Sequence, residues 1–247
     1  TSDALQPIFI TATPNGVVAV LTDALGEGSN EDAGSITYTI TLQGAGENVP
    51  EPPTADETFT FTLNDGTEVT VVVHAGELTG STTLNWDGES SDFNSALPDS
   101  DVYVDPQDIT VNEGSLSGTN NSGYDALDTF DDTSGETVPD FDNTVTATLS
   151  ATESVSEDSE AGSVITYTVT LSGGPGAIGP TSPLVFELEN GQFVTIAAGE
   201  TSGSVTFDAS DDDVYNETAS VSNSISSVSG GSEYEQLALS TASVSTT

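Results

Sequence analysis

Two stretches of this chain, 129 positions apart as measured from Thr37 to Thr166, carry almost the same alternating sequence. Residues 34–42 read GSITYTITL and residues 162–171 read GSVITYTVTL. Three further blocks return in the same order, although the spacing between copies shrinks along the chain. They are residues 75–77 with 198–200, 80–81 with 203–204, and 101–103 with 213–215. Four matched blocks in unchanged order indicate two copies of one unit, each of ordinary domain size.

The repeat predicts two domains, residues 1–138 and residues 139–247, with the boundary in a run rich in Asp, Ser, Gly, Thr and Pro. The first copy carries extra loop residues, most of them around residues 90–98. Residues 2–5 resemble residues 124–127, which indicates that residues 1–14 are the tail of a preceding copy. The sequence contains no methionine and begins at Thr1, so we expect it to be excised from a longer polypeptide.

The repeated block alternates apolar and polar residues with a period of two, which predicts a half-buried strand. Ile36, Tyr38, Ile40 and Leu42 are expected to face a core, and the threonines between them to face water. Residues 59–63 and 69–73 show similar apolar runs on either side of Asn64-Asp65-Gly66, which predicts a β-hairpin. Residues 184–188 and 193–196, around Asn190-Gly191, predict the same hairpin in the second copy.

Short strands with frequent turn signals and no helical stripe favour an all-β fold. We predict two tandem β-sandwiches with Greek-key connections, joined end to end.

Charge excludes several function classes. The 247 residues include 41 acidic side chains, one histidine, and neither lysine nor arginine, for a formal charge of −41. Nucleic acids and anionic membrane surfaces are therefore repelled. No apolar stretch approaches the roughly 18 residues of a membrane span, so we expect no membrane insertion. The absence of cysteine excludes disulfides and thiolate chemistry.

No protein cation other than a protonated His74 can offset the repulsion among these carboxylates, so we expect salt or bound metal ions to do so. Hard oxygen ligands without thiolate or imidazole partners favour Ca²⁺ (or Mg²⁺) over zinc, copper or iron. The acids cluster in loops, and Asp99-x-Asp101-x-x-x-Asp105 returns as Asp211-x-Asp213-x-x-x-Glu217. In an extended segment these spacings place carboxylates on one side. The predicted calcium ligands are Glu31, Asp32, Asp99, Asp101, Asp105, Asp140, Asp142, Asn143, Glu157, Asp158, Asp211, Asp213 and Glu217.

The junction cluster, which also includes Asp131 and Asp132, has a mechanical consequence. Without metal, like charges in a linker leave two domains free to swing. With calcium bound, we expect the linker to become a strut.

The sequence from Ile165 to Tyr215 resembles the tandem extender repeats of giant RTX-type bacterial adhesins, the BapA- and LapA-like proteins. The resemblance rests on ITYTVTL, Asn190-Gly191, residues 198–206 (AGETSGSVT) and residues 211–215 (DDDVY), and residues 230–237 resemble the repeat ending. It extends to both copies and is closer in the second; the insertion near residues 90–98 departs from it.

The resemblance implies immunoglobulin-like sandwiches rigidified by calcium, with neighbouring repeats of the same chain as partners. It implies a spacer in a biofilm adhesin, exported by type I secretion to the bacterial cell surface, where it holds a distal binding region of unknown ligand away from the cell. The glycine-rich nonapeptides of the RTX region are absent from this stretch.

Two other function classes compete with the spacer. No nucleophile elbow, HExxH motif or phosphate loop is present, so we do not expect an enzyme. A carbohydrate- or peptide-binding module is the alternative, with Trp86, Phe93 and the inserted loop near them as the binding surface. We expect Trp86 to pack against the end of the sandwich rather than to bind a ligand, and His74 to be a surface residue.

Overall fold

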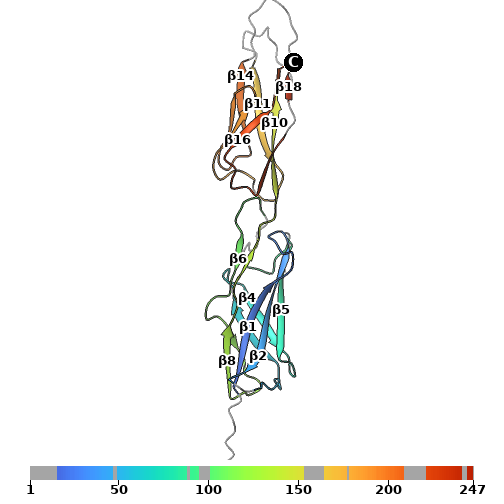
Figure 1. Cartoon of the computed structure of the whole chain (residues 1–247), viewed down its shortest axis with the longest axis vertical. Coiled ribbons are helices and arrows are strands. Elements are labelled where there is room, and N and C mark those ends of the chain that lie inside the picture. Colours follow the sequence, from blue (N-terminus) through green and yellow to red (C-terminus); the bar gives the residue numbers. More distant parts are fainter. Residues whose placement is uncertain are drawn as a thin grey trace, which may run out of the picture. The chain divides into compact units, whose positions relative to one another are not determined.

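The computed structural model is all-β, and the residues that it describes form strands and loops but no helix (Figure 1). The described residues are 16–46, 49–87, 90–94, 101–152, 164–176, 178–208, 221–240 and 244–246. Internal contacts divide the chain into two compact units. Unit 1 comprises Thr1–Asp99 and Pro106–Pro139, and unit 2 comprises Ser100–Asp105 and Asp140–Thr247. This grouping differs from the predicted boundary in placing Ser100–Asp105 with the second unit.

Unit 1 packs a four-stranded sheet, ordered β5-β2-β1-β8, against a three-stranded sheet, ordered β4-β3-β7, and adds the pair β6-β9. The strands of unit 1 are β1 (Gly16–Leu25), β2 (Gly34–Gly44), β3 (Glu57–Thr62), β4 (Glu68–Val73), β5 (Thr79–Trp86), β6 (Gln107–Ile109), β7 (Ser117–Gly118), β8 (Ala126–Asp131) and β9 (Glu136–Val138).

Unit 2 repeats this plan, with sheets ordered β14-β11-β10-β17 and β13-β12-β16 and the pair β15-β18. Its strands are β10 (Thr144–Ala151), β11 (Val164–Ser172), β12 (Leu184–Leu188), β13 (Phe193–Ile196), β14 (Ser202–Asp208), β15 (Val221–Asn223), β16 (Ile225–Ser229), β17 (Gln236–Leu239) and β18 (Val244–Thr246). The predicted all-β sandwich is therefore confirmed, and the sequence repeat is matched by a repeat of strand order.

One pairing in each unit was not anticipated from the sequence. β1 pairs in parallel with β8, and β10 pairs in parallel with β17, although the other strand pairs are antiparallel. A parallel partner must arrive by a long connection from the far end of the sheet. A strand near the end of each repeat, β8 or β17, is thereby added to the sheet beside a strand near its beginning, β1 or β10.

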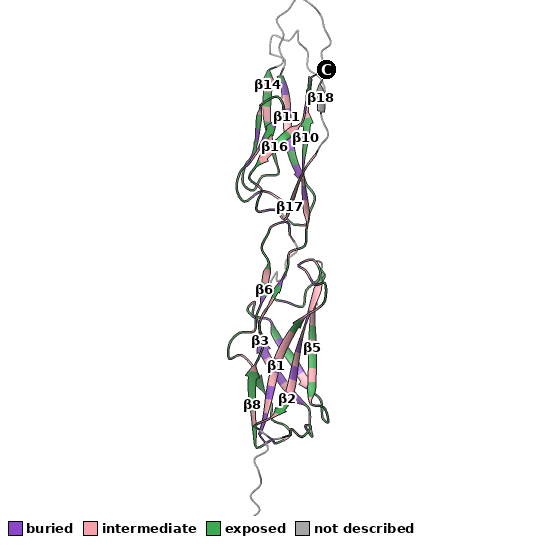
Figure 2. Cartoon of the chain, in the orientation of Figure 1, coloured by how far each residue is buried: buried purple, intermediate pink, exposed green. Residues whose placement is uncertain are grey.

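The predicted alternation along the repeated block is confirmed. In β2, Ile36, Tyr38, Ile40 and Leu42 are buried, whereas the threonines between them keep partial exposure (Figure 2). β11 follows the same pattern, with Ile165 and Tyr167 fully buried. Because side chains alternate between the two faces of a strand, one face of each sheet supplies the core.

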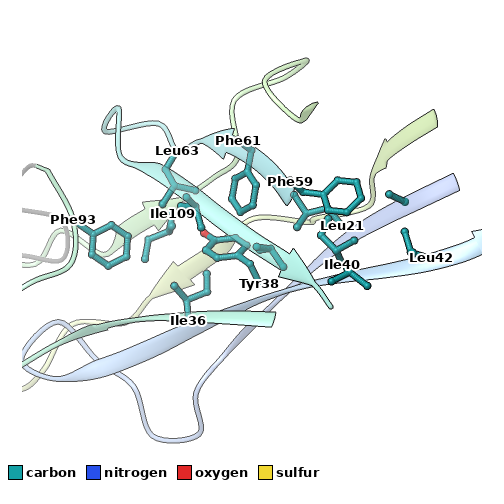
Figure 3. Packing of buried hydrophobic residues seen from close by; sticks show 14 of the residues in the cluster. Leu21, Ile36, Tyr38, Ile40, Leu42, Phe59, Phe61, Leu63, Phe93 and Ile109 are labelled. Carbon is teal, nitrogen blue, oxygen red and sulfur yellow. The ribbon is translucent and has the colours of Figure 1, made fainter. Parts of the chain in front are cut away.

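Figure 3 shows the core of unit 1, where side chains of the two sheets meet. Tyr38 of β2 packs edge-on against Phe61 of β3, with ring centroids 5.0 Å apart. Leu21, Ile40 and Phe59 continue the same cluster. Unit 2 has its own separate cluster of buried residues, built on the equivalent strands. Two separate clusters mean that each unit has a hydrophobic core of its own.

Both predicted hairpins are present. β3 pairs with β4 around Gly66, and β12 pairs with β13 around Gly191. These glycines have φ angles of 83° and 77°, a left-handed conformation that costs glycine little because it has no Cβ.

A second pair of glycines explains the repeated Gly-Ser dipeptide. A Cβ added to Gly80 would lie 2.1 Å from the carbonyl oxygen of Val72, and one added to Gly203 would lie 2.1 Å from that of Thr195. Each glycine therefore lets the edge strands of the two sheets pass close to each other, β5 against β4 in unit 1 and β14 against β13 in unit 2. The dipeptide recurs because the same close backbone approach recurs.

Candidate functional site

The aromatic residues proposed for ligand binding are part of the core of unit 1. Trp86 is 3 % exposed, and its indole N–H donates to the carbonyl oxygen of Asn30 at 2.7 Å. Phe93 is also buried and packs edge-on against Trp86, with ring centroids 5.9 Å apart. A sugar ring stacks only on an exposed aromatic face. The carbohydrate- or peptide-binding alternative thus loses the exposed rings on which it depended.

His74 lies at the surface, as expected, and its Nδ1 is 3.0 Å from Oδ2 of Asp56. The other carboxylate oxygen of Asp56 accepts the N–H of Ala75 at 2.9 Å. These contacts, first the Ala75 N–H and then His74, lower the pKa of Asp56. The arrangement fastens the turn after β4.

Several predicted calcium ligands cannot be compared with the structure. Asp99, Glu157, Asp158, Asp211, Asp213 and Glu217 lie outside the described residues. The second-copy counterpart of the Asp101–Asp105 motif is among them, so its role stays a prediction.

The first predicted cluster lies in the loop between β1 and β2 of unit 1. Glu31 is only 1 % exposed, and its N–H donates to the carbonyl oxygen of Pro139 at 3.0 Å. Asn30 shapes the loop, because its Oδ1 accepts the N–H groups of Asp32 and Ala33. A carboxylate buried to this degree needs compensating polar partners or a cation.

The second cluster lies on the segment Ser100–Asp105, within unit 2. Asp101 and Asp105 each place a carboxylate oxygen within 4.8 Å of the other. Two oxygens at this separation can both reach one Ca²⁺, whose ligand distances are about 2.3–2.6 Å. Oδ1 of Asp101 also accepts the N–H of Tyr103 at 2.6 Å, which turns the segment at this point.

The third cluster includes an acid that the sequence analysis did not single out. Asp140 and Glu235 place carboxylate oxygens within 4.8 Å of one another. Oε2 of Glu235 accepts the N–H of Asn143 at 2.6 Å. Oδ1 of Asp140 and Oε1 of Glu233 are buried and find no hydrogen-bond donor among the described residues. Buried acceptors of this kind are where a cation is most needed.

The remaining junction acids have other environments. Asp142 is exposed. Asp131 accepts both the N–H and the hydroxyl of Thr133 and so closes the turn after β8, and the N–H of Asp132 donates to Leu21. Glu233 and Glu235 alternate within Gly230–Leu237, the block that resembled a repeat ending. The sequence analysis named neither residue, although their alternate spacing, like that of Asp99 and Asp101, is a signal that could have found them.

The segment that carries Asp101 and Asp105 is built into unit 2. Val102 is fully buried in its core. Tyr103 bridges to Tyr234 and stacks on its ring. The N–H of Val104 donates to the backbone carbonyl oxygen of Glu233 at 2.9 Å, and the N–H of Glu235 donates to the backbone carbonyl oxygen of Val102 at 3.1 Å. Strand-like hydrogen bonds thus join residues that lie some 130 positions apart in sequence.

Residues 143–247 match the LapA domain family. This match supports a LapA-like adhesin family, and it suggests a role in a bacterial surface adhesin. It likewise points to an extracellular location at the cell surface and to a structural, non-enzymatic role. A search of curated proteins finds no match to the chain. None of the described residues form a helix with the length and hydropathy needed to cross a membrane.

Proposed function

We propose that this chain is a calcium-rigidified spacer segment of a secreted, LapA-like surface adhesin, built from tandem immunoglobulin-like repeats. The acidic pair Asp140 and Glu235 carries the proposal, because their carboxylate oxygens lie within 4.8 Å of one another and Oδ1 of Asp140 is buried without a donor among the described residues. The adhesin context is supported by the LapA domain at residues 143–247. Type I export and a part in biofilm formation follow from the same family likeness.

Electrostatics gives the mechanism. With 41 acidic side chains and no lysine or arginine, the folded chain concentrates negative charge that the unfolded chain spreads out. A cation that binds only the folded state stabilises it by about 2.7 kcal/mol per site when its free concentration is a hundredfold above the dissociation constant. Extracellular modules bind Ca²⁺ at about 0.1–1 mM, so the spacer would stiffen only outside the cell.

Thermal unfolding followed by circular dichroism tests the calcium site. The chain is melted in excess chelator, in millimolar CaCl₂, and in MgCl₂ and NaCl at matched ionic strength. We expect Ca²⁺ to raise the melting temperature well above the two controls. Equal stabilisation by all three salts would mean that the salts only screen the surface carboxylates. The proposed calcium mechanism would then be wrong.

Two variants assign the effect to residues. We expect Asp140→Asn combined with Glu235→Gln to lose most of the calcium-specific rise. Asp142→Asn is the matched control, since it removes an exposed charge from the same stretch of chain and should keep the rise. Small-angle scattering with and without Ca²⁺ tests the rigidification separately. We expect the spread of maximum dimensions to narrow when the ion is present.

A further inference from the structure

The segment Ser100–Asp105 lies between two parts of unit 1 in the sequence, yet it belongs to unit 2. The chain therefore leaves unit 1, contributes to unit 2, returns to unit 1, and enters unit 2 again after Pro139. We propose that this segment is a donor strand, and that unit 2 carries a docking site whose partner is an extended segment of the Asp-Val-Tyr type supplied by the preceding repeat. This inference requires neither calcium nor the adhesin role.

The docking site is shaped for Val102. A Cβ added to Gly174 would lie 2.2 Å from Cγ1 of Val102, so only glycine leaves room for this side chain. Gly174 also has a φ angle of 72°, which further disfavours any larger residue. Val102 itself is fully buried, and burying a valine side chain contributes about 1.5–3 kcal/mol.

Unit 1 differs at the equivalent position. Val18 is the partner of Gln43 in β1 and β2, and Thr146 is the partner of Ser172 in β10 and β11. Aligned on these registers, Ala45 of unit 1 stands where unit 2 has Gly174. Ala45 carries a Cβ and does not have the positive φ of Gly174, so unit 1 lacks the glycine that leaves room for the valine in unit 2.

Tyr103 provides the second anchor. Its ring stacks on Tyr234, and its hydroxyl donates to the carbonyl oxygen of Gly179. The hydroxyl of Tyr234 donates to the neighbouring carbonyl of Ile178 at 2.8 Å. Tyr124 of unit 1 makes the corresponding bond to Glu51 at 3.0 Å. Tyr234 of the docking site therefore has a counterpart in unit 1, whereas Tyr103 is supplied to unit 2 by the docked segment.

The backbone completes the recognition. Two hydrogen bonds, from Val104 N–H to Glu233 and from Glu235 N–H to Val102, add the segment to unit 2 as a strand would be added to a sheet edge. In such docking, backbone bonds supply affinity and side-chain pockets supply specificity. Residues 213–215 repeat the sequence Asp-Val-Tyr. They lie outside the described residues, but by sequence they are the donor that a following repeat would receive.

Hydrogen exchange in the full chain, in excess chelator and about 0.15 M NaCl, tests the proposal. Val102→Asp places a charge in the docking site, and we expect the amides of Val104 and Glu235 to exchange at least tenfold faster. The amides of β11 should stay protected. Val104→Asp is the matched control, because Val104 is 55 % exposed, and it should leave these amides slow. Unchanged protection in Val102→Asp, or equal loss in both variants, would overturn the proposal.

Tyr103→Phe keeps the measurement informative if Val102→Asp unfolds unit 2. This variant removes only the hydroxyl bond to Gly179, and we expect faster exchange confined to Val104 and Glu235. If exchange at Val104 and Glu235 is unchanged in Tyr103→Phe, the proposed role of Tyr103 as the second anchor is wrong. Because these exchange experiments are done in excess chelator, their result does not depend on calcium binding. The docking proposal can therefore hold even if the calcium experiments fail.

A peptide supplied in trans tests partner recognition. A labelled peptide with the sequence of residues 99–107 should bind the Val102→Asp chain, whose own segment is undocked. It should not bind the unaltered chain, where the tethered segment has a millimolar effective concentration. A peptide of residues 209–217 should bind the same variant, and a version with aspartate in place of its valine should not. Failure of the 99–107 peptide to bind would overturn the docking site, and failure of the 209–217 peptide alone would overturn the extension to a following repeat.

Discussion

Tyr103 stacks on Tyr234 with the ring centroids 5.6 Å apart and the ring planes 21° from parallel. The two residues come from different copies of the sequence repeat, Tyr103 from a loop within the first copy and Tyr234 from the last part of the second. Their contact brings Ser100–Asp105 into unit 2. It also places two phenols in one partly buried site, next to the carboxylates of Asp101 and Glu233.

The tyrosine pair predicts a loss of stability in alkali. Burial, and then neighbouring negative charge, raises the pKa of both phenols above the ordinary value. The folded state therefore keeps protons that the unfolded state releases above about pH 10. We expect the free energy of unfolding to fall as the pH rises from about 10 towards the folded-state pKa. Tyr103→Phe should make this fall shallower, and phenolate absorbance should lose one late-titrating group; an unchanged titration would contradict the assignment.

Glu57 predicts an effect at the acid end. It is fully buried at the start of β3, and its carboxylate accepts the N–H groups of Asn121 and Ser122 at 2.8 and 2.6 Å and the hydroxyl of Thr119 at 3.0 Å. Burial raises its pKa, but these donors outweigh burial and lower it overall. The stabilisation is therefore present above the unfolded-state pKa of about 4.3 and is lost as the pH falls through the folded-state value.

Glu57→Gln tests this directly by urea unfolding at several pH values. We expect a loss of about 1.5–3 kcal/mol at pH 7, because hydrogen bonds to a charged acceptor are replaced by weaker ones. The difference from the unaltered chain should shrink below about pH 4. Glu68→Gln, which changes an exposed acid on the neighbouring strand, serves as the control. A pH-independent loss would mean that the side-chain shape, and not its charge, matters.

The close approach at Gly203 predicts a steric cost. Gly203→Ala places a methyl group against the Thr195 carbonyl oxygen, where the gap is only 2.1 Å, and forcing the strands apart costs about 1–3 kcal/mol. Ser202→Ala changes an exposed neighbour in β14 and should be nearly neutral. Thermal unfolding of the two variants side by side checks the prediction. Equal melting temperatures would show that the strands separate without cost.

The buried hydroxyl of Tyr167 predicts a substitution that does not harm the fold. This oxygen finds no hydrogen-bond partner among the described residues, and the same holds for Tyr38, its counterpart in unit 1. An unsatisfied buried hydroxyl costs about 1–3 kcal/mol. We expect Tyr167→Phe to be neutral or to raise the melting temperature. A marked loss of stability would reveal a partner that the hydroxyl needs.

Local chemistry made much of the fold predictable. The alternation of Ile36, Tyr38 and Ile40 predicts a strand with one buried face, since the period of two is a property of the extended backbone. The glycines at positions 66 and 191 mark hairpins because few other residues adopt their φ angle. The candidate metal clusters were less predictable, because acids are so numerous that their spacing in the sequence does not show which carboxylates come together, as Asp140 and Glu235 do.

By itself, the sequence determined the all-β class, the repeat, the hairpins and the excess of negative charge, since each depends on residues near one another or on composition. The tertiary structure decided which core receives Val102, that β8 and β17 pair in parallel with the first strands of their sheets, and that Glu235 joins Asp140. An apolar residue between acids is compatible with either core. Only the space left by Gly174 and the ring of Tyr234, far away in the chain, selects unit 2.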